Sequence, residues 1–563
     1  MTSPSQRDFK ISLESSARRV TLRHLGWMHL QRFASVVVIA TAALSGCAAL
    51  APSPPASAQT ERNEQENEQS THVAGARAAY KLEIAAPEEL RKLLSTYLDL
   101  GRFQNASGAE GVTRSELDRL VALAPAQART LLETEGYFSA NVKVERGAGT
   151  PPLLRVNVTP GPRTRVSAVT LRVQGPMQDA AAAGDPSART LRAALEKRWP
   201  LQAGQAWRQG AWGDAKSETL AHLRANGYPA ATLALSHARI DVPAKSAQLE
   251  VLFDSGPLFR LGKLKIEGLQ RYDEWVVNNL AGFAPGTPYT DQRLMDFQDR
   301  LRKVGLFETA SVDIETDPAH AEEAAVLVRL RELPLQQATV GVGISANTGP
   351  RVSIEHLHRR ACGWNWSAKT KGELGHKLRS LEIELNSHPL EGNYRNLLGA
   401  SAERLATTDE VRTSQRARVG RARETKRIEH LYYAELTRSK LLTEATGATT
   451  TGDAASLNYE WIWRELDSAL LPTDGVTASA QVAGGYARAS DADNGPFGRT
   501  LGRLTWYKPF GSSWYGLTRV EAGQVFAADA VGLPDTLLFR AGGDNSVRGY
   551  GYRSLGPVKG GAL

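Results

Sequence analysis

A glycine-rich segment near residue 550 carries the side chains best suited to specific polar chemistry. Residues 539–557 read FRAGGDNSVRGYGYRSLGP, with arginines at 540, 548 and 553 among Phe539, Tyr550 and Tyr552. A guanidinium group can stack on an aromatic ring and can bind a carboxylate through two parallel hydrogen bonds. The glycines exclude a regular helix or strand, and the GxxxxGK[ST] pattern of a phosphate loop is absent. The sequence predicts either a loop that recognises a carboxylate or an ordinary glycine-rich surface loop.

Other side chains offer little catalytic chemistry. His356 and His358 are two residues apart, so they share one face of a strand, but a third metal ligand is not evident and a solvated pair is the simpler interpretation. Two cysteines, Cys47 and Cys362, cannot build a disulfide framework or a CxxC metal site. No GxSxG elbow, HExxH motif or dinucleotide fingerprint is present, and no carboxylate pair stands out as acid and base. We therefore expect no enzyme, no cofactor and no metal.

The first 76 residues predict export followed by a flexible tether. A basic stretch precedes the 12-residue apolar run Phe33–Leu44, which is shorter than the roughly 20 residues of a spanning helix and is typical of a signal peptide. Residues 44–47 read LSGC and resemble a bacterial lipobox, in which Cys47 would be lipidated; cleavage after Ala58 is the alternative. Residues 52–69 are rich in Pro, Ser, Gln, Glu and Asn, a composition typical of disorder. The net charge of +8 is spread over many segments and gives no nucleic-acid stripe.

A small domain then repeats three times. The segments LETEGYF, LRANGYP and LRKVGLF each close an amphipathic helix with a glycine, at 136, 227 and 305. An alternating strand and a second strand follow each of them, and a further strand opens the next unit. The repeat of roughly 80–95 residues is a strand-helix-helix-strand-strand module whose open edges can accept another strand. An Ala/Gly/Pro stretch, residues 175–186, is expected to be an insertion in the second copy.

From residue 335 the pattern changes to a period of two. Val340, Val342 and Ile344 alternate with small or polar residues, and similar segments of about 10 residues recur, which is typical of a transmembrane β-barrel. A soluble β-sandwich would also alternate. The tryptophans favour the barrel because they fit interfacial girdles; they lie at positions 364, 366, 461, 463, 506 and 514.

Repeats, barrel and glycine-rich loop together resemble the Omp85 superfamily of outer-membrane proteins. Its signature loop contains Val-Arg-Gly-Phe/Tyr, which is similar to Val547, Arg548, Gly549 and Tyr550 here. A similar Asp…Pro-Thr-x-Gly hairpin precedes that loop in the family, and matches Asp467, Pro472, Thr473 and Gly475. The repeats resemble the family's periplasmic POTRA domains, and their number points to the TamA branch, because BamA has five and two-partner secretion pores have two.

The resemblance implies an assembly factor that inserts other proteins into the outer membrane. The repeats would receive unfolded β-barrel proteins, autotransporters included, by strand addition, and a TamB-like inner-membrane protein would be the partner. The first barrel strand would be a lateral gate, and its glycines suit a strand that is easily opened. Arg548 would contact the inner barrel wall, and Arg540 and Arg553 would matter less. A secretion pore and a passive scaffold remain alternatives. The expected gate residues are Val340, Gly341, Val342, Gly343 and Ile344.

The fold class expected is therefore α+β repeats followed by an all-β membrane domain. Family barrels have about 16 strands, and the sequence stops at Leu563, soon after the loop. We therefore expect a fragment, or a natural truncation, in which the C-terminal strands are absent. The expected parts are a signal peptide with a possible lipobox (1–50), a disordered tether (51–76), POTRA 1 (77–161), POTRA 2 (162–257), POTRA 3 (258–334) and a barrel (335–563).

Overall fold

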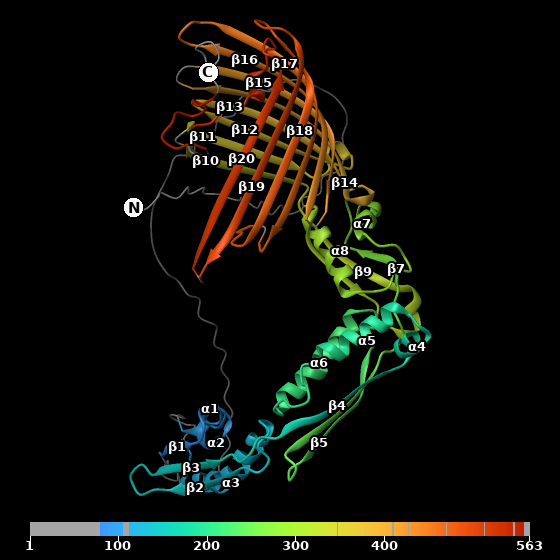
Figure 1. Cartoon of the computed structure of the whole chain (residues 1–563), viewed down its shortest axis with the longest axis vertical. Helices are drawn as coiled ribbons and strands as arrows, with labels where there is room; N and C mark the ends of the chain where they lie inside the picture. Colours follow the sequence, from blue (N-terminus) through green and yellow to red (C-terminus); the bar gives the residue numbers. More distant parts are fainter. Residues whose placement is uncertain are drawn as a thin grey trace, which may run out of the picture. The chain divides into compact units, whose positions relative to one another are not determined.

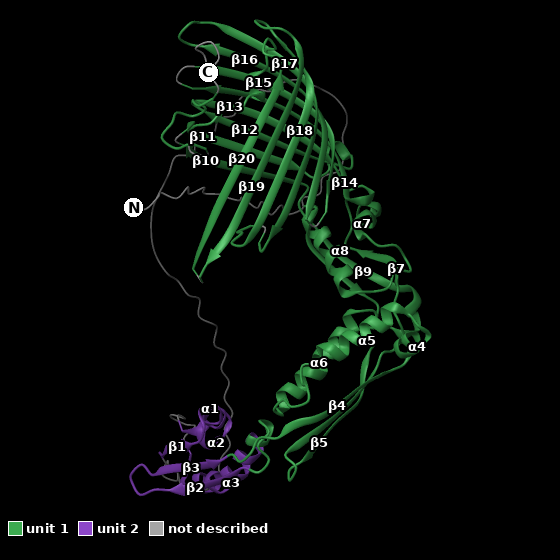
Figure 2. Cartoon of the chain, in the orientation of Figure 1, with its two compact units in different colours: residues 1–13, 132–139, 160–563 green, residues 14–131, 140–159 purple. Residues whose placement is uncertain are grey.

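The structure is a computed structural model. It describes residues 79–104, 112–345, 347–407, 410–425, 427–468, 470–511, 513–543 and 546–556. The expected signal peptide, the lipidation site Cys47, the alternative cleavage after Ala58 and the tether lie outside the described residues. Figure 2 divides the chain into two compact units: one holds the described part of residues 14–131 and 140–159, and the other that of residues 132–139 and 160–563.

The purple unit of Figure 2 contains the first repeat. Its sheet has the order β1-β3-β2, with β3 parallel to β1 and antiparallel to β2. Helix α3 runs on into the next unit and carries Pro125 inside it. The elements are β1 (Lys81–Ala85), α1 (Glu88–Tyr97), α2 (Asp99–Phe103), α3 (Arg114–Thr134), β2 (Asn141–Arg146) and β3 (Leu153–Thr159).

The second and third repeats have the same strand order. Their sheets have the orders β4-β6-β5 and β7-β9-β8. In each, the central strand is parallel to the first strand and antiparallel to the last. The second repeat contains β4 (Arg165–Gln174), α4 (Pro176–Ala183), α5 (Pro186–Arg198), α6 (Gln209–Ala225), β5 (Thr232–Asp241) and β6 (Ser246–Asp254). The third contains β7 (Leu261–Glu267), α7 (Glu274–Ala281), α8 (Asp291–Lys303), β8 (Phe307–Ile314) and β9 (Ala324–Glu332).

The three marker glycines have the backbone conformation that their position after a helix requires. Gly136, Gly227 and Gly305 have φ values of 91°, 105° and 76°, in the region that glycine adopts without the steric cost of a Cβ. Each glycine ends the long helix of its repeat and turns the chain into the following strand. The same local device therefore builds the same module three times.

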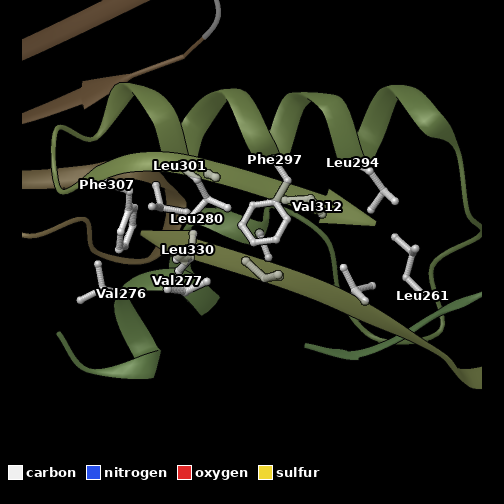
Figure 3. Close-up of a cluster of buried hydrophobic side chains, with 14 of the residues drawn as sticks. Leu261, Val276, Val277, Leu280, Leu294, Phe297, Leu301, Phe307, Val312 and Leu330 are labelled. Carbon is white, nitrogen blue, oxygen red and sulfur yellow. The ribbon is translucent and has the colours of Figure 1, made fainter. Parts of the chain in front are cut away.

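The third repeat illustrates how each module is held together. Helices α7 and α8 place Val276, Leu280 and Phe297 over the sheet, where Val312 and Leu330 face them (Figure 3). Phe297 and Val276 are fully buried. Burying a side chain of this size contributes about 1.5–3 kcal/mol, so the helix faces hold the sheet by apolar contact.

The rest of the described chain forms one antiparallel sheet of 11 strands, β10 to β20, in which each strand pairs with the next in sequence (Figure 1). Three repeats of the β-α-α-β-β type, the first two with one additional short helix, and a barrel-like sheet confirm the fold class expected from the sequence. The strands are β10 (Gln336–Ser345), β11 (Gly349–His358), β12 (Trp366–Gly375), β13 (Leu378–Ser387), β14 (Tyr394–Ala406), β15 (Glu410–Glu424), β16 (Ile428–Thr443), β17 (Thr449–Leu466), β18 (Gly475–Ala489), β19 (Gly495–Phe510) and β20 (Trp514–Ala527).

One face of this sheet is apolar and exposed. Val340, Val342 and Ile344 of β10 are exposed, and Val352 and Ile354, which pair with Val342 and Val340 on β11, are exposed beside them. The opposite face carries charged pairs such as Arg418–Glu384. In the parts of the chain that the structure describes, no helix has the length and hydropathy needed to cross a membrane.

Candidate functional site

The segment 528–556, which follows β20, forms a loop whose base is closed by a short β-bridge. Ala541 and Leu555 exchange both backbone hydrogen bonds, at 2.7 and 2.9 Å. Inside the bridge, the Gly543 amide donates to the Tyr550 carbonyl at 3.1 Å. The described residues between the bridge partners, 542–543 and 546–554, are called the loop tip below.

The first half of the loop is packed on the charged face of the sheet. Val531, Leu533 and Leu537 contact a small apolar cluster made by Ala454, Ala487 and Phe497. Two glycines on the strands make room for it. A Cβ on Gly452 would stand 3.1 Å from Pro534 Cα, and a Cβ on Gly523 would overlap the Phe539 ring. The strands are therefore shaped to receive this segment closely.

Arg499 of β19 binds the same segment through its guanidinium group. Its Nε donates to the Leu537 carbonyl at 3.2 Å, and its Nη1 donates to Gln481 Oε1 of β18 at 2.8 Å. The same group lies over the Phe539 ring, 4.4 Å from its centroid. Arg499 thus uses both the hydrogen bonding and the ring stacking that a guanidinium allows.

Asp535 joins the loop to strand β15. Its carboxylate accepts hydrogen bonds from Arg412 Nη1 (3.2 Å), Arg540 Nε (2.9 Å) and Arg553 Nη2 (3.1 Å). Arg412 also donates from Nη2 to Glu403 Oε1 of β14 at 2.8 Å. The sequence analysis does not identify Asp535, Arg412 or Arg499 as site residues. The one signal for Asp535 in the sequence is its position as a lone carboxylate five residues before Arg540.

The signature residues lie exposed on the loop tip. Val547, Arg548, Gly549 and Tyr550 are exposed, and Arg548 has no ion pair or side-chain hydrogen bond with any residue the structure describes. Arg540 and Arg553 instead bind Asp535 within the loop, and the expected contact of Arg548 with the inner barrel wall stays a prediction. These two arginines flank the Ala541–Leu555 bridge, whereas Arg548 lies on the tip. Whether Arg548 matters most for function stays a prediction.

The expected gate strand, β10, pairs with β11 and with no other strand of the described residues. Gly341 lies opposite Ser353, and a Cβ there would stand 2.8 Å from Ser353 Oγ; Gly343 lies opposite Arg351. The loop tip approaches the turn that follows this strand, because a Cβ on Gly543 would stand 2.7 Å from Asn347 Oδ1. The structure thus brings the loop and the end of β10 together, which the sequence alone does not reveal.

The Asp467 motif forms the turn between β17 and β18. Asp467 accepts from the Thr473 amide (3.0 Å), the Thr473 hydroxyl (2.6 Å) and the Ser468 amide (2.9 Å). The Thr473 hydroxyl, above all, lowers the pKa of Asp467 to about 2. Gly475 has φ 123°, and a Cβ there would overlap the Glu465 carbonyl. Together with Pro472, these residues fix a turn, which is a structural role.

The histidine pair is engaged in protein contacts. His356 Nε2 lies 3.2 Å from Gln336 Oε1, and His358 Nδ1 accepts from the Arg360 amide at 3.2 Å. Within the described ranges, no group of three His, Cys, Asp or Glu residues is placed to hold a metal ion.

The junction between the third repeat and the sheet centres on Arg359, in the turn after β11. This side chain is almost wholly buried and donates to the Gly305 carbonyl (2.8 Å), the Pro334 carbonyl (2.7 Å) and Gln337 Oε1 (2.9 Å). It therefore contacts the end of the third repeat, the connecting segment and strand β10 at once. His388 Nε2 donates to the Arg359 carbonyl at 2.8 Å, and the imidazole meets the Tyr272 ring edge-on.

Comparison with known proteins agrees with this architecture. The family model of the Omp85 superfamily domain matches residues 336–562. BamA from Haemophilus ducreyi lacking POTRA domains 1–3 aligns with a TM-score of 0.54 and 15% identity, over 70% of this chain and 76% of that chain. CdiB from Escherichia coli aligns over 83% of this chain and 81% of that chain, with 14% identity and a TM-score of 0.37. The BamA similarity shows the fold alone. The sheet and its loop therefore match the model of the Omp85 superfamily domain, and they follow three POTRA-like units in this chain.

Proposed function

We propose that this chain is an outer-membrane assembly factor of the TamA type, which receives unfolded β-barrel proteins, autotransporters included, and inserts them into the bilayer. The observation that carries the proposal is strand β10. It presents an apolar face and contains two glycines, which weaken the pairing of a strand with its neighbours. A strand of this kind can accept a further strand along its other edge.

The physical driving force is the transfer of substrate strands into lipid. An unpaired backbone amide or carbonyl in the hydrocarbon core costs several kcal/mol, so a substrate strand must stay hydrogen-bonded as it enters. The β10 edge supplies those partners, and the apolar face of the substrate then gains from burial in lipid. No nucleotide is needed for this step.

The POTRA-like units supply the earlier contacts. Each has a three-stranded sheet in which β2, β5 or β8 is an edge strand within the described chain. An edge strand offers backbone hydrogen bonds to an extended peptide without regard to its sequence. The units would lie in the periplasm, and a TamB-like inner-membrane protein would be the partner that delivers or supports the substrate.

Reconstitution distinguishes this function from a secretion pore. The full chain is placed in phospholipid vesicles, and an unfolded autotransporter barrel is added in urea and diluted. We expect heat-modifiable, membrane-integrated substrate to form several-fold faster than in empty vesicles. A pore would instead deliver a soluble passenger to the vesicle interior, where added protease cannot reach it. Equal insertion rates with and without the protein would refute the proposal.

A further inference from the structure

Asp535 is the carboxylate that three arginines of the loop site share. Arg412 comes from β15, Arg540 precedes the Ala541–Leu555 bridge, and Arg553 lies on its other side. The side chains of Asp535, Arg412 and Arg540 are 9%, 11% and 8% exposed. A buried carboxylate with three guanidinium partners is charge-assisted at every contact.

The arrangement ties both ends of the tip to one point on the sheet. Arg540 lies one residue before Ala541, and Arg553 lies two residues before Leu555. Asp535 therefore binds a residue at each end of the loop tip. Arg412 fixes the same carboxylate to β15, and Glu403 fixes Arg412 to β14. On its other side the tip reaches Asn347, beside the end of β10.

Stability alone does not account for this cluster. Buried ion pairs are often no more stable than apolar residues of similar volume, because the charges lose their hydration. A cluster of three arginines and two carboxylates can instead fix the position of the segments that carry its members. It therefore specifies where the tip lies.

We propose that Asp535 is the positioning residue of the signature loop: it holds the tip, with Arg548 exposed upon it, beside the turn that follows β10. This inference rests on the proposed function, because the tip would act on the strand that receives substrates. Asp535 acts through Arg540, Arg553 and Arg412, and does not itself contact the substrate.

The test is Asp535→Asn in the full chain, followed by amide hydrogen exchange. We expect the Ala541 and Leu555 amides, which close the bridge, to exchange at least about tenfold faster. Exchange along the β16–β17 ladder should stay unchanged. Asp453→Asn is the matched control, because Asp453 pairs with Arg438 on the same sheet but is 54% exposed. In this control, exchange should stay unchanged both at the Ala541 and Leu555 amides and along the β16–β17 ladder. Unchanged bridge amides in Asp535→Asn would overturn the proposal.

A double variant separates positioning from repulsion among the arginines. Arg412→Gln combined with Asp535→Asn removes one cation together with the anion. If repulsion alone opens the tip, this pair restores slow exchange at Ala541 and Leu555, and the positioning role is wrong. We expect exchange to stay fast. Should Asp535→Asn fail to show heat-modifiable mobility, Arg553→Gln removes one contact of the three, and about threefold faster exchange at Leu555 is expected; no change there would overturn the proposal.

Assembly of a substrate barrel in vesicles gives the second readout. We expect Asp535→Asn to lower the insertion rate about tenfold while the sheet stays folded. Fast tip exchange with normal insertion would overturn the positioning role and leave the proposed function intact. If the unaltered chain inserts no substrate, the proposed function fails, and the exchange result then bears on the loop alone.

Discussion

Replacing Arg359 should loosen the third POTRA-like unit from the barrel-like sheet. The guanidinium donates three hydrogen bonds, to Gly305, Pro334 and Gln337, from a site where the residue is 4% exposed. A hydrogen bond from a charged group contributes about 1.5–3 kcal/mol. When the junction opens, water hydrates the two backbone carbonyls in place of Arg359, so the three contributions do not add in full. We therefore expect Arg359→Met to cost about 3 kcal/mol of junction stability, or roughly two orders of magnitude in its opening equilibrium.

Hydrogen exchange at one amide reports this opening directly. The Asn279 side-chain amide of α7 donates to the Pro389 carbonyl at 3.0 Å, from the third repeat to the segment after β13, so its protection depends on a closed junction. Its exchange should accelerate strongly in Arg359→Met. Arg359→Lys should have an intermediate effect, because one ammonium group cannot reach all three acceptors.

The matched control is Arg331→Met on β9. Arg331 pairs with Glu308 at 2.8 Å, but its side chain is 70% exposed, and exposed pairs contribute at most about 1 kcal/mol. Equal exchange rates of the Asn279 side-chain amide in Arg359→Met and in Arg331→Met would refute this role of Arg359.

Three further outcomes are expected. Burial lowers the pKa of His388, so the junction should lose stability as pH falls below the unfolded-state value of about 6.5. His388→Gln should therefore reduce the difference in melting temperature between pH 7.5 and pH 5. The same difference in His388→Gln and in the unaltered chain would contradict this. Asp467→Ala should speed exchange of the Thr473 amide several-fold, and in the unaltered chain that protection should persist on acidification until pH approaches about 2. Arg548→Ala and Arg548→Lys should both slow substrate insertion while leaving the Ala541 and Leu555 amides protected, and normal insertion by both variants would remove Arg548 from the mechanism.

Local sequence signals predict the modules well. A glycine that ends a helix needs a positive φ and has few substitutes, so Gly136, Gly227 and Gly305 mark the three repeats in the sequence itself. Apolar alternation in β10 likewise predicts which side chains are exposed on the outer face. Both signals depend on residues close together in the chain.

Composition alone leaves open the structure of a short element that glycine and proline delimit. The composition of residues 175–186 predicts an insertion without giving its structure, and this stretch contains helix α4, which begins at Pro176 and ends before Gly184. Proline suits the first turn of a helix, and Gly184, at φ 101°, suits its end. The alanines between them are strong helix formers, so the composition fits a helix as well as a loop.

The loop site could not be predicted because its contacts are long-range. Asp535 meets Arg412 across 123 residues of sequence, and no periodicity links the two positions. The family pattern points to Arg548, whose type and neighbours suit carboxylate binding, yet the bound guanidinium groups belong to Arg540 and Arg553. Only the packing of the loop on the sheet selects among the three arginines.

Cross-linking from strand β10 tests the proposed function most directly. A photoreactive side chain is placed at Val342 of β10 or at Leu436 of β16, two exposed positions on apolar-facing strands. An autotransporter barrel is then captured during insertion by the full chain in vesicles. The account predicts strong cross-links from position 342 and few from position 436. A third probe replaces Glu435, which lies on the charged face of β16. Equal cross-linking from positions 342 and 436, or cross-linking from position 435 alone, would contradict insertion at the edge of β10.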